Sequence, residues 1–412
     1  MRDSADNMQQ LQTLKGFRDF LPSEVRQRQY LIEKIKSLFE QWGFEPLESP
    51  VLEYAELFKG QIGEDEKLFF KFTDQGGREV ALRYDQTVPT ARIVAQYRNE
   101  IKLPFKRYQI GTVYRAEKPQ AGRYREFLQA DADIFGISSP VADAQVIALS
   151  LEIYKMLGFK NAKVLINDRA LLKNMPYEAI VAIDKLKKIG EEGVIKEMEG
   201  KGVDSDKAKE YLSSIKNIKP NETINVILDY LKSMGYDQSW YAFDPSIARS
   251  FAYSSGPIWE VVIPEYSSGS VLGGERYDNL IESIGGVKIP ATGFAVGFDR
   301  TFEAAKQLGL LPEKNSTAKV LVTVFNSSLL NKSIAYANKL RQKGIDVDIY
   351  PDSEQKLGKQ MKYADDKKIP FVIIIGTEEA KEGSFKVKNM KTGEEKKLTD
   401  LSHLSSQFNK LL

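Results

Sequence analysis

The residues from Arg107 to Gly136 combine side chains that suit a ligand carrying both phosphate and ammonium groups. Seven of them surround a short turn at 119–122: Arg115, Glu117, Arg123, Arg125, Gln129, Asp131 and Asp133. Apolar and polar residues alternate on both sides of this turn, which predicts a hairpin of two half-buried strands. Side chains two apart in a strand share a face, so Arg115, Gln129 and Asp133 are expected on one surface. The alternative is a surface hairpin with exposed ion pairs.

Three further segments carry the same kinds of side chains: LRYDQT at 82–87, ARSFAYSSG at 248–256 and GFAVGFDR at 293–300. Their candidate ligand-binding residues are Arg83, Asp85, Thr87, Arg249, Tyr253, Ser254, Glu260 and Arg300. The sequence has no glycine loop ending in Gly-Lys-Ser/Thr and no GxGxxG pattern, so neither common nucleotide-binding loop is supported. A nucleotide would instead be held by arginines on an antiparallel sheet.

The composition excludes several kinds of chemistry. There is no cysteine, and His403 is the single histidine. Disulfides, thiolate chemistry, a histidine-based triad and a multi-histidine zinc site are therefore ruled out. The remaining groups are carboxylates, arginines, amides, hydroxyls and a hard cation. The start of the chain lacks the apolar core of a signal peptide and no run is long enough to cross a membrane, which together favour a cytoplasmic protein without a membrane anchor.

The elements that position these residues follow from hydrophobic periodicity. Helical spacing predicts helices at 26–42, 88–97 and 140–157, the last followed by a strand at 163–166. A hairpin is expected from 68–73 and 80–84, turned at Gly76 and Gly77. The strand predicted at 46–52 is interrupted by Pro50, which is typical of an edge strand or a bulge where another chain approaches.

The residue composition and hydrophobic spacing change twice in the second half of the chain. Residues 171–236 have helical spacing with many lysines and glutamates, which predicts a helical insertion with a solvated face, or alternatively one that contacts a polyanionic substrate. Strand character returns at 240–263. The segment SSGSVLGGERYDNLI is expected to form a glycine-rich turn before a helix, and 293–308 a short strand or turn leading into another helix.

The last part of the chain follows a polar break at 314–317. Strands and helices alternate from Val320 to Ile375, which predicts a separate α/β domain with a mostly parallel sheet. Residues 318–412 hold 17 Lys and Arg against 12 Asp and Glu, so the basic character of a chain of net charge +2 lies here. The expected organisation is an α+β catalytic domain built on an antiparallel sheet (1–170 and 239–313), a helical insertion domain (171–238) and a C-terminal α/β domain (318–412).

The motifs resemble those of the class II aminoacyl-tRNA synthetases, and specifically the histidyl-tRNA synthetase family. FEQWGFEPLESPVLE at 39–53 is similar to the first class motif, a dimer interface. YRAEKPQAGRYREF and GFAVGFDR are similar to the second and third motifs. LRYDQT, and the ARSFAYSSG segment followed by GGERYD, are similar to signatures of the histidyl branch. The resemblance begins at KGFRDFLP (15–22) and continues into KLGKQMKYADDKKIPFVIIIG, which is similar to an anticodon-binding domain.

The resemblance implies a site for ATP. Arg115 would hold the α-phosphate, Arg123 and Arg300 would clamp the γ-phosphate, and Glu117 would accept from the adenine amine. Phe127 would stack on the adenine ring. Mg²⁺ is expected on the β- and γ-phosphates, because hard oxygens bind it.

The resemblance also implies a site for histidine. Asp85, Thr87 and Gln129 would bind the α-ammonium group, and Asp133 would accept from an imidazole nitrogen. Arg249 would lie beside the reacting carboxylate and the α-phosphate. The remaining histidine-binding residues would be Tyr253, Ser254 and Tyr277. The alternatives are a structural ion pair for Arg249 and core packing for the two tyrosines.

Two positions depart from the family pattern. The segment that usually reads RGLDYYTG has Ser254 in place of its second tyrosine, and the segment that usually reads GGGRYD has Glu275 in place of its third glycine. Either the lineage has drifted, with water or a neighbour compensating for Ser254, or histidine specificity is altered. Drift is favoured because Arg115, Arg123, Gln129, Arg249 and Arg300 are all present.

The implied protein is a homodimeric, cytoplasmic enzyme that activates L-histidine with ATP and transfers it to the 3′ end of tRNA-His. Lys118 and Gln120 are candidates for contact with the acceptor end of the tRNA. Lys356, Lys359 and Lys362 are candidates for phosphate contacts near the anticodon, or alternatively a solvated helix face. The rival hypotheses are a non-catalytic, histidine-binding regulatory paralogue and a tRNA-sensing module without aminoacylation.

Overall fold

The computed structural model describes residues 11–61, 68–120, 122–249, 253–313 and 316–400. It divides into two compact units, one built on Arg28–Leu311 and the other on Pro312–Leu412. His403 lies outside the described residues. Among the residues described, no helix is long and apolar enough to cross a membrane.

The first unit is built on an eight-stranded sheet with the order β1-β5-β6-β11-β10-β9-β7-β8. The strands are β1 (Glu45–Pro46), β5 (Phe105–Tyr114), β6 (Glu126–Phe135), β7 (Lys163–Asp168), β8 (Tyr241–Phe243), β9 (Pro257–Val262), β10 (Leu272–Arg276) and β11 (Ala291–Gly297). Only the outermost pairs, β1 with β5 and β7 with β8, are parallel. The predicted hairpin is confirmed, because β5 and β6 pair antiparallel from Phe105 opposite Phe135 to Tyr114 opposite Glu126.

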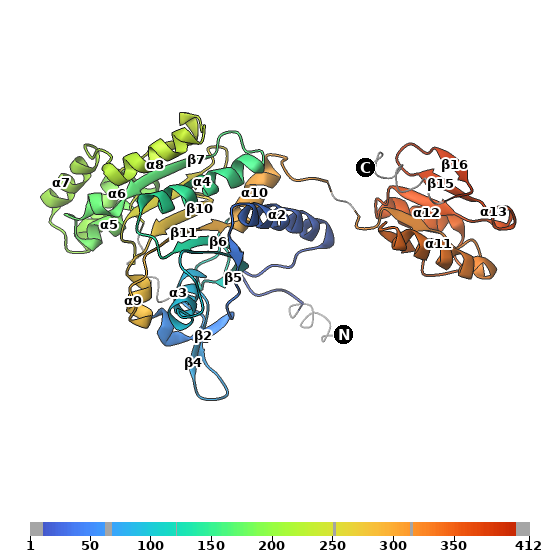
Figure 1. The fold of residues 1–412 in the computed structure, drawn as a ribbon, viewed down its shortest axis with the longest axis horizontal. Helices are drawn as coiled ribbons and strands as arrows, with labels where there is room; N and C mark the ends of the chain where they lie inside the picture. The colour runs from blue at the N-terminus through green and yellow to red at the C-terminus, as the bar shows by residue number, and fades with distance from the viewer. Residues whose placement is uncertain (1–10, 62–67, 121, 250–252, 314–315, 401–412) are drawn as a thin grey trace, which may run out of the picture. The chain divides into compact units, whose positions relative to one another are not determined.

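Helices cover one face of this sheet (Figure 1): α2 (Pro22–Gln41), α4 (Pro140–Met156), α8 (Glu222–Ser233) and α10 (Phe298–Gln307). Alternation along the strands supplies the apolar partners. Ala130, Ala132 and Ile134 of β6 join the helical core, and so do Phe294 and Val296 of β11. The alternate residues therefore face the opposite, polar side of the sheet: Gln129, Asp131 and Asp133 in β6, and Gly293, Ala295 and Gly297 in β11.

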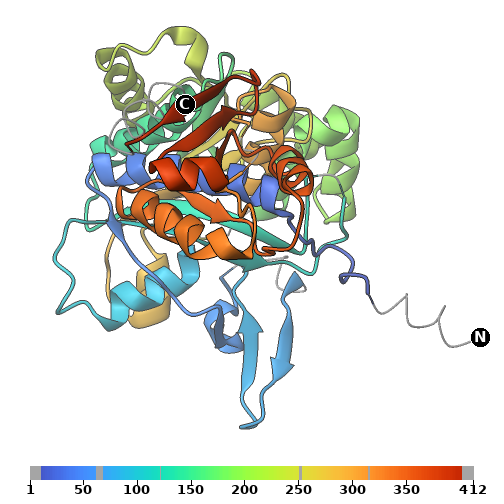
Figure 2. The same ribbon diagram turned by 90° about the vertical axis from the view of Figure 1, so that its right-hand side faces the viewer.

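A smaller layer lies next to the polar side. It contains the three-stranded sheet β2-β4-β3, with β2 (Leu52–Tyr54), β3 (Lys71–Thr73) and β4 (Glu79–Leu82), and the helices α3 (Thr87–Gln96) and α9 (Leu280–Gly285). A short 3₁₀ helix, η1 (Ala55–Phe58), packs there as well. Figures 1 and 2 show the β3–β4 hairpin projecting away from the large sheet.

Two expectations about strands need correction. The strand expected at 46–52 is two short pieces, β1 and β2, in different sheets, because the chain leaves the large sheet after Pro46. The glycine-rich turn expected around LGGERYD is instead a central strand, β10, paired on both sides. Strand propensity is low there, and the glycines are explained by close neighbours: a Cβ at Gly274 would lie 2.2 Å from the Trp259 ring.

The helical segment after β7 is divided between two cores. Helices α5 (Tyr177–Ile183), α6 (Leu186–Gly200) and α7 (Ser205–Ile215) share their own apolar cluster. Helix α8, expected in the insertion, instead packs Ile224, Ile227 and Leu231 into the core that covers the large sheet. Its strongly one-sided apolar stripe requires a partner, and α4 supplies it.

The second unit has a five-stranded mixed sheet of order β13-β12-β14-β15-β16. Its elements are β12 (Val320–Val322), η5 (Ser327–Leu329), α11 (Leu330–Gln342), β13 (Val347–Ile349), α12 (Leu357–Asp366), β14 (Phe371–Ile374), α13 (Thr377–Glu382), β15 (Phe385–Asn389) and β16 (Glu395–Leu398). The predicted alternation is confirmed for β12, β13 and β14, which are parallel. Strands β15 and β16, which the pattern did not predict, add an antiparallel edge.

Candidate active site

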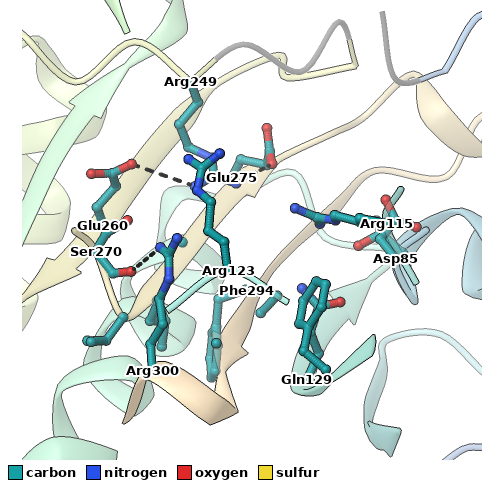
Figure 3. Close-up of a pocket in the computed structure, with 18 of the residues that line it drawn as sticks. Asp85, Arg115, Arg123, Gln129, Arg249, Glu260, Ser270, Glu275, Phe294 and Arg300 are labelled. Carbon is teal, nitrogen blue, oxygen red and sulfur yellow. Dashed lines mark hydrogen bonds and ion pairs between the residues drawn. The ribbon is translucent and has the colours of Figure 1, made fainter. Parts of the chain in front are cut away.

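A cavity of roughly 730 Å³ opens on the polar side of the large sheet, where four segments distant in sequence meet (Figure 3). The sequence-predicted residues that line it are Asp85, Thr87, Arg115, Glu117, Lys118, Gln120, Arg123, Phe127, Gln129, Asp133, Arg249, Tyr253, Glu260, Tyr277 and Arg300. Arginines contribute four positive charges to a wall that also carries carboxylates and amides. This combination suits a ligand with several phosphates and an ammonium group.

The floor of the cavity follows from strand register. Asp133 on β6, Gly293 on β11 and Glu275 on β10 are directly paired in one row across three antiparallel strands. The middle position must be glycine, because a Cβ at Gly293 would lie 1.9 Å from Asp133 Oδ1. The carboxylate of Asp133 thus extends over the backbone of β11, between the flanking strands.

Asp133 is held by two neighbours. Arg107, its cross-strand partner on β5, forms an ion pair with its Oδ2 at 2.6 Å, and the Tyr277 hydroxyl donates to its Oδ1 at 2.5 Å. Arg107 is 0% exposed and Asp133 is 2% exposed. Burial raises the pKa of Asp133, while the Arg107 charge and the Tyr277 hydrogen bond oppose that rise.

Asp85 and Thr87 lie at the start of α3, and Gln129 lies on β6 beside them. Asp85 Oδ1 accepts from the backbone N–H of Val88 at 3.1 Å, which fixes the carboxylate at the helix start. Burial raises the pKa of Asp85 to about 6, against the opposing effect of the Val88 hydrogen bond and the Arg115 charge.

The hairpin arginines occupy the other part of the wall. The Arg115 guanidinium lies over the Tyr84 ring, 4.1 Å from its centroid, and 5.3 Å from the centroid of Phe127. Arg123 pairs with Glu117 at 3.0 Å. Arg300, in the first turn of α10, donates from Nε to the Gly122 carbonyl and from Nη1 to the Ser270 carbonyl, each at 2.9 Å. These backbone contacts orient the Arg300 guanidinium at the cavity.

Arg249 enters from the loop between β8 and β9. Its side chain lies over Gly273, where a Cβ would be 1.9 Å from Nη1, so only glycine leaves room for the guanidinium. Nη2 pairs with Glu275 at 3.3 Å and Nη1 with Glu260 at 4.0 Å, and Figure 3 shows the side chain directed between the two carboxylates. Burial opposes it, but these carboxylates raise the pKa of Arg249.

Two expected binding residues are placed differently. Ser254 is not among the residues that line this cavity; its hydroxyl donates to the Glu275 carboxylate, and it lines a smaller neighbouring cavity. Arg83 is buried and donates to the carbonyls of Thr112 at 2.7 Å and Ser49 at 2.9 Å, so it joins elements and faces no ligand. Residues 250–252 of the ARSFAYSSG segment and Ala121 of the turn lie outside the described residues.

Sequence reasoning missed Arg107 as a site residue and recorded Glu275 only as a departure from the pattern. Both could have been found from periodicity. Arg107 lies directly opposite Asp133 in the hairpin, so its side chain is on the same polar face. Glu275 follows Gly273 by two positions and so shares its face once the segment is taken as a strand.

The three lysines expected to contact tRNA lie elsewhere. Lys356 directly precedes α12 in the second unit, and Lys359 and Lys362 lie along that helix. All three side chains are exposed. Their spacing of three residues brings them toward one face of α12.

Asp85 should make stability depend on pH in a specific sense. Its pKa is raised in the folded protein, so below pH 6 the folded state binds a proton more readily than the unfolded state. Stability from this group therefore rises as pH falls from 7 to 4. We expect the unfolding free energy of the wild type, relative to Asp85→Asn, to increase by about 2 kcal/mol between pH 7 and pH 4.5.

Chemical denaturation of both proteins at pH 4.5, 5.5 and 7 measures this difference. Asp206→Asn, at an exposed carboxylate, is the control and should show no comparable trend. A difference between wild type and Asp85→Asn that stays constant with pH would contradict the assignment.

The chain matches family models, curated relatives and solved structures. A family model described as histidyl-tRNA synthetase matches residues 16–192 and 169–301, and one described as an anticodon binding domain matches residues 319–411. The histidine–tRNA ligase of Wolinella succinogenes is 37% identical over 420 residues, which cover 93% of this chain and 95% of the relative. That of Helicobacter pylori is 36% identical over 416 residues, covering 92% and 94%.

Solved structures agree with the sequence matches. The histidyl-tRNA synthetase of Nostoc sp. PCC 7120 superposes with a TM-score of 0.82 at 27% identity, covering 98% of this chain and 99% of that one. The apo histidyl-tRNA synthetase of S. aureus gives a TM-score of 0.73 at 23% identity, covering 97% and 99%, which supports the fold alone.

Proposed function

The chain belongs to the histidyl-tRNA synthetase family, and from that premise and the arrangement of its cavity we propose that it is a histidine–tRNA ligase. The observation that carries the proposal is the single cavity in which four arginines meet Asp85, Gln129 and Asp133. Cations for a triphosphate and acceptors for an amino acid lie on one polar sheet face. In the proposed first step the histidine carboxylate attacks the α-phosphorus of ATP, and the bond to pyrophosphate breaks.

The arginines and their neighbours are proposed to bind ATP. Arg115 contacts the α-phosphate, Arg123 and Arg300 contact the γ-phosphate, Glu117 accepts from the adenine amine, and Phe127 stacks on the adenine ring. The Arg115 position is supported by its aromatic neighbours, which hold the cation while leaving it at the cavity. Fixed cations stabilise the charge that grows on the phosphate better than water does, because they need no reorganisation.

The acidic and amide side chains are proposed to bind histidine. Asp85, Thr87 and Gln129 accept from the α-ammonium group, which has three donors. Asp133 accepts from an imidazole N–H, with Tyr277 fixing its carboxylate and Tyr253 packed against the Tyr277 ring at 6.0 Å between centroids. The Arg249 guanidinium lies over Gly273 beside the Glu275 carboxylate, and it is proposed to contact the reacting carboxylate and α-phosphate.

In the proposed second step the terminal adenosine hydroxyl of tRNA-His attacks the histidyl carbonyl, and AMP leaves. Lys118 and Gln120 are exposed at the rim of the cavity, which supports contact with the acceptor end. Lys356, Lys359 and Lys362 would add phosphate contacts from the second unit, giving affinity with little sequence specificity.

Magnesium is proposed to accompany ATP. The described residues include no group of three acidic or histidine side chains that could hold a metal ion by themselves. Mg²⁺ bound to ATP keeps water and phosphate ligands and needs only one or two carboxylates from the protein. Glu260, which lines the cavity and interacts electrostatically with Arg300, would hold it, and the ion would neutralise charge on the β- and γ-phosphates.

Histidine-dependent exchange of pyrophosphate into ATP tests the proposal, followed by aminoacylation of tRNA-His. We expect exchange with histidine and none with the other amino acids. The regulatory and tRNA-sensing alternatives both predict no exchange at saturating histidine and ATP. They are not favoured, because the anticodon-binding match at 319–411 and the four cavity arginines are present.

The proposed assembly is a homodimer in the cytoplasm, where ATP and tRNA are available. Four large apolar side chains are exposed on or next to the three-stranded sheet: Val51, Leu52, Tyr54 and Phe72. Tyr54, Val80 and Phe72 are directly paired in one row across that sheet, so they share a face. An apolar face in the segment similar to a dimer motif supports association there.

Leu52→Glu should convert the dimer to a monomer, because a charge would be buried in the interface. Sedimentation equilibrium should then give 46.6 kDa, against twice that mass for the wild type. Ile334→Glu, at a comparably exposed side chain in the second unit, is the matched control and should remain dimeric. A Leu52→Glu protein that stays dimeric would place the interface elsewhere.

A further inference from the structure

The two positions that depart from the family pattern are in direct contact. Ser254 and Glu275 are 21 residues apart in sequence, and the Ser254 hydroxyl donates to the Glu275 carboxylate. Ser254 is 9% exposed and Glu275 is 5% exposed. Two residues that differ from the pattern and satisfy each other indicate one coupled change in place of two independent ones.

Glu275 connects this pair to Arg249. One carboxylate oxygen accepts from Ser254, and the other pairs with Arg249 Nη2 at 3.3 Å. Glu275 and Gly273 are two apart on β10 and share the polar face, and the guanidinium occupies the space that a Cβ at Gly273 would fill. The carboxylate therefore stands beside the guanidinium at the cavity floor, as Figure 3 shows.

The backbone of Arg249 is fixed by different groups. Its φ of 46° lies in the left-handed region, which is unfavourable for arginine. Asp184 Oδ1 accepts from its N–H at 3.0 Å, and Arg169 Nη1 donates to its carbonyl at 3.2 Å. These contacts set where the side chain starts. Its far end is set by Glu275, with Glu260 more distant at 4.0 Å.

We propose that Ser254 and Glu275 form a positioning pair that holds the Arg249 guanidinium over Gly273 for adenylate formation. Ser254 orients the carboxylate, and Glu275 supplies the negative charge that keeps Arg249 in place. A glycine at 275 would remove that charge, and the Ser254 hydroxyl would lose its acceptor. The proposal rests on the proposed function, because the role of Arg249 in adenylate formation comes from it.

The test measures kcat and the KM for histidine and ATP in pyrophosphate exchange for Glu275→Gln, Glu275→Asp, Ser254→Ala and the Ser254→Ala/Glu275→Gln double variant. Glu275→Gln should lower kcat by roughly 10–100-fold, since misplacing a catalytic group by about 1 Å has effects of that size. Glu275→Asp, which keeps the charge, should restore part of the loss. The changes should fall mainly in kcat, because Arg249 acts on charge that develops in the transition state.

The double variant tests the coupling between Ser254 and Glu275 more directly than the single variants do. Ser254→Ala should lower kcat by a few-fold, and the double variant should match Glu275→Gln, because Ser254 acts only through Glu275. Glu152→Gln is the matched control: its carboxylate accepts from the Tyr236 hydroxyl at 2.6 Å, and it does not line the cavity. Thermal melting of every variant identifies losses due to folding. If Glu275→Gln does not fold, the comparison of Ser254→Ala with Glu275→Asp decides.

Additive effects of the two changes, or a Glu275→Gln kcat within twofold of the wild type, would overturn the positioning pair. Such a result would leave the proposed function intact if the wild type still exchanges pyrophosphate with histidine. A wild type with no histidine-dependent exchange would instead overturn the proposed function, and the positioning pair with it.

Discussion

Arg249→Ala is expected to lower histidine-dependent pyrophosphate exchange by about 10²–10³-fold, the usual effect of losing one fixed group that stabilises transition-state charge. Arg249 is held at both ends: Asp184 and Arg169 bind its backbone, and Glu275 pairs with its guanidinium. No reorganisation is then needed when negative charge develops. Binding of tRNA should be nearly unchanged, because the second unit and the cavity rim are untouched.

Gly273→Ala provides an independent route to the same result. The added Cβ would lie 1.9 Å from Nη1 of Arg249, and the three closest heavy atoms around it all belong to that side chain. The guanidinium should be displaced while the strand remains. We expect a large loss of exchange with a melting temperature close to that of the wild type. Normal exchange in both variants would show that Arg249 has only a structural role.

Arg107→Met is expected to destabilise the protein by about 3–5 kcal/mol, the usual consequence of leaving one member of a buried ion pair alone. Arg107 and Asp133 are paired at 2.6 Å, and both are almost completely buried. Without the guanidinium, the Asp133 carboxylate keeps the Tyr277 hydrogen bond but loses its ion pair. Chemical denaturation at pH 7 measures the loss.

The pH dependence of this loss identifies its cause. The Arg107 charge opposes the rise in the Asp133 pKa caused by burial, so its removal raises that pKa further. A protonated Asp133 no longer needs a cation, so the deficit of Arg107→Met should be smaller at pH 5 than at pH 7. The Arg107→Met/Asp133→Asn double variant should recover part of the stability. A deficit that is the same at both pH values and unrelieved in the double variant would indicate lost packing alone.

The sequence by itself determined the hairpin and the chemistry of its polar face. Alternation from Glu126 to Phe135 separates the residues that pack against helices from those that face the cavity, because the side-chain period of a strand is two. The types of the arginines and acids in the four segments were enough to predict a site for a ligand with phosphate and ammonium groups, and the family resemblance made that ligand ATP and histidine. The same patterns predicted β12, β13 and β14 of the second unit.

The tertiary structure alone decided which of these residues hold one another. Strand β10 has two consecutive glycines and little strand propensity. It is a strand because β9 and β11 pair with it on both sides, and Arg249 and Trp259 occupy the space beside the glycines. Helix α8 packs in the core of the large sheet and not with α5 to α7, because its apolar stripe contacts α4. Ser254 faces Glu275 instead of the main cavity because strand register and loop path bring the two together. Such contacts join residues far apart in sequence, and local periodicity carries no information about them.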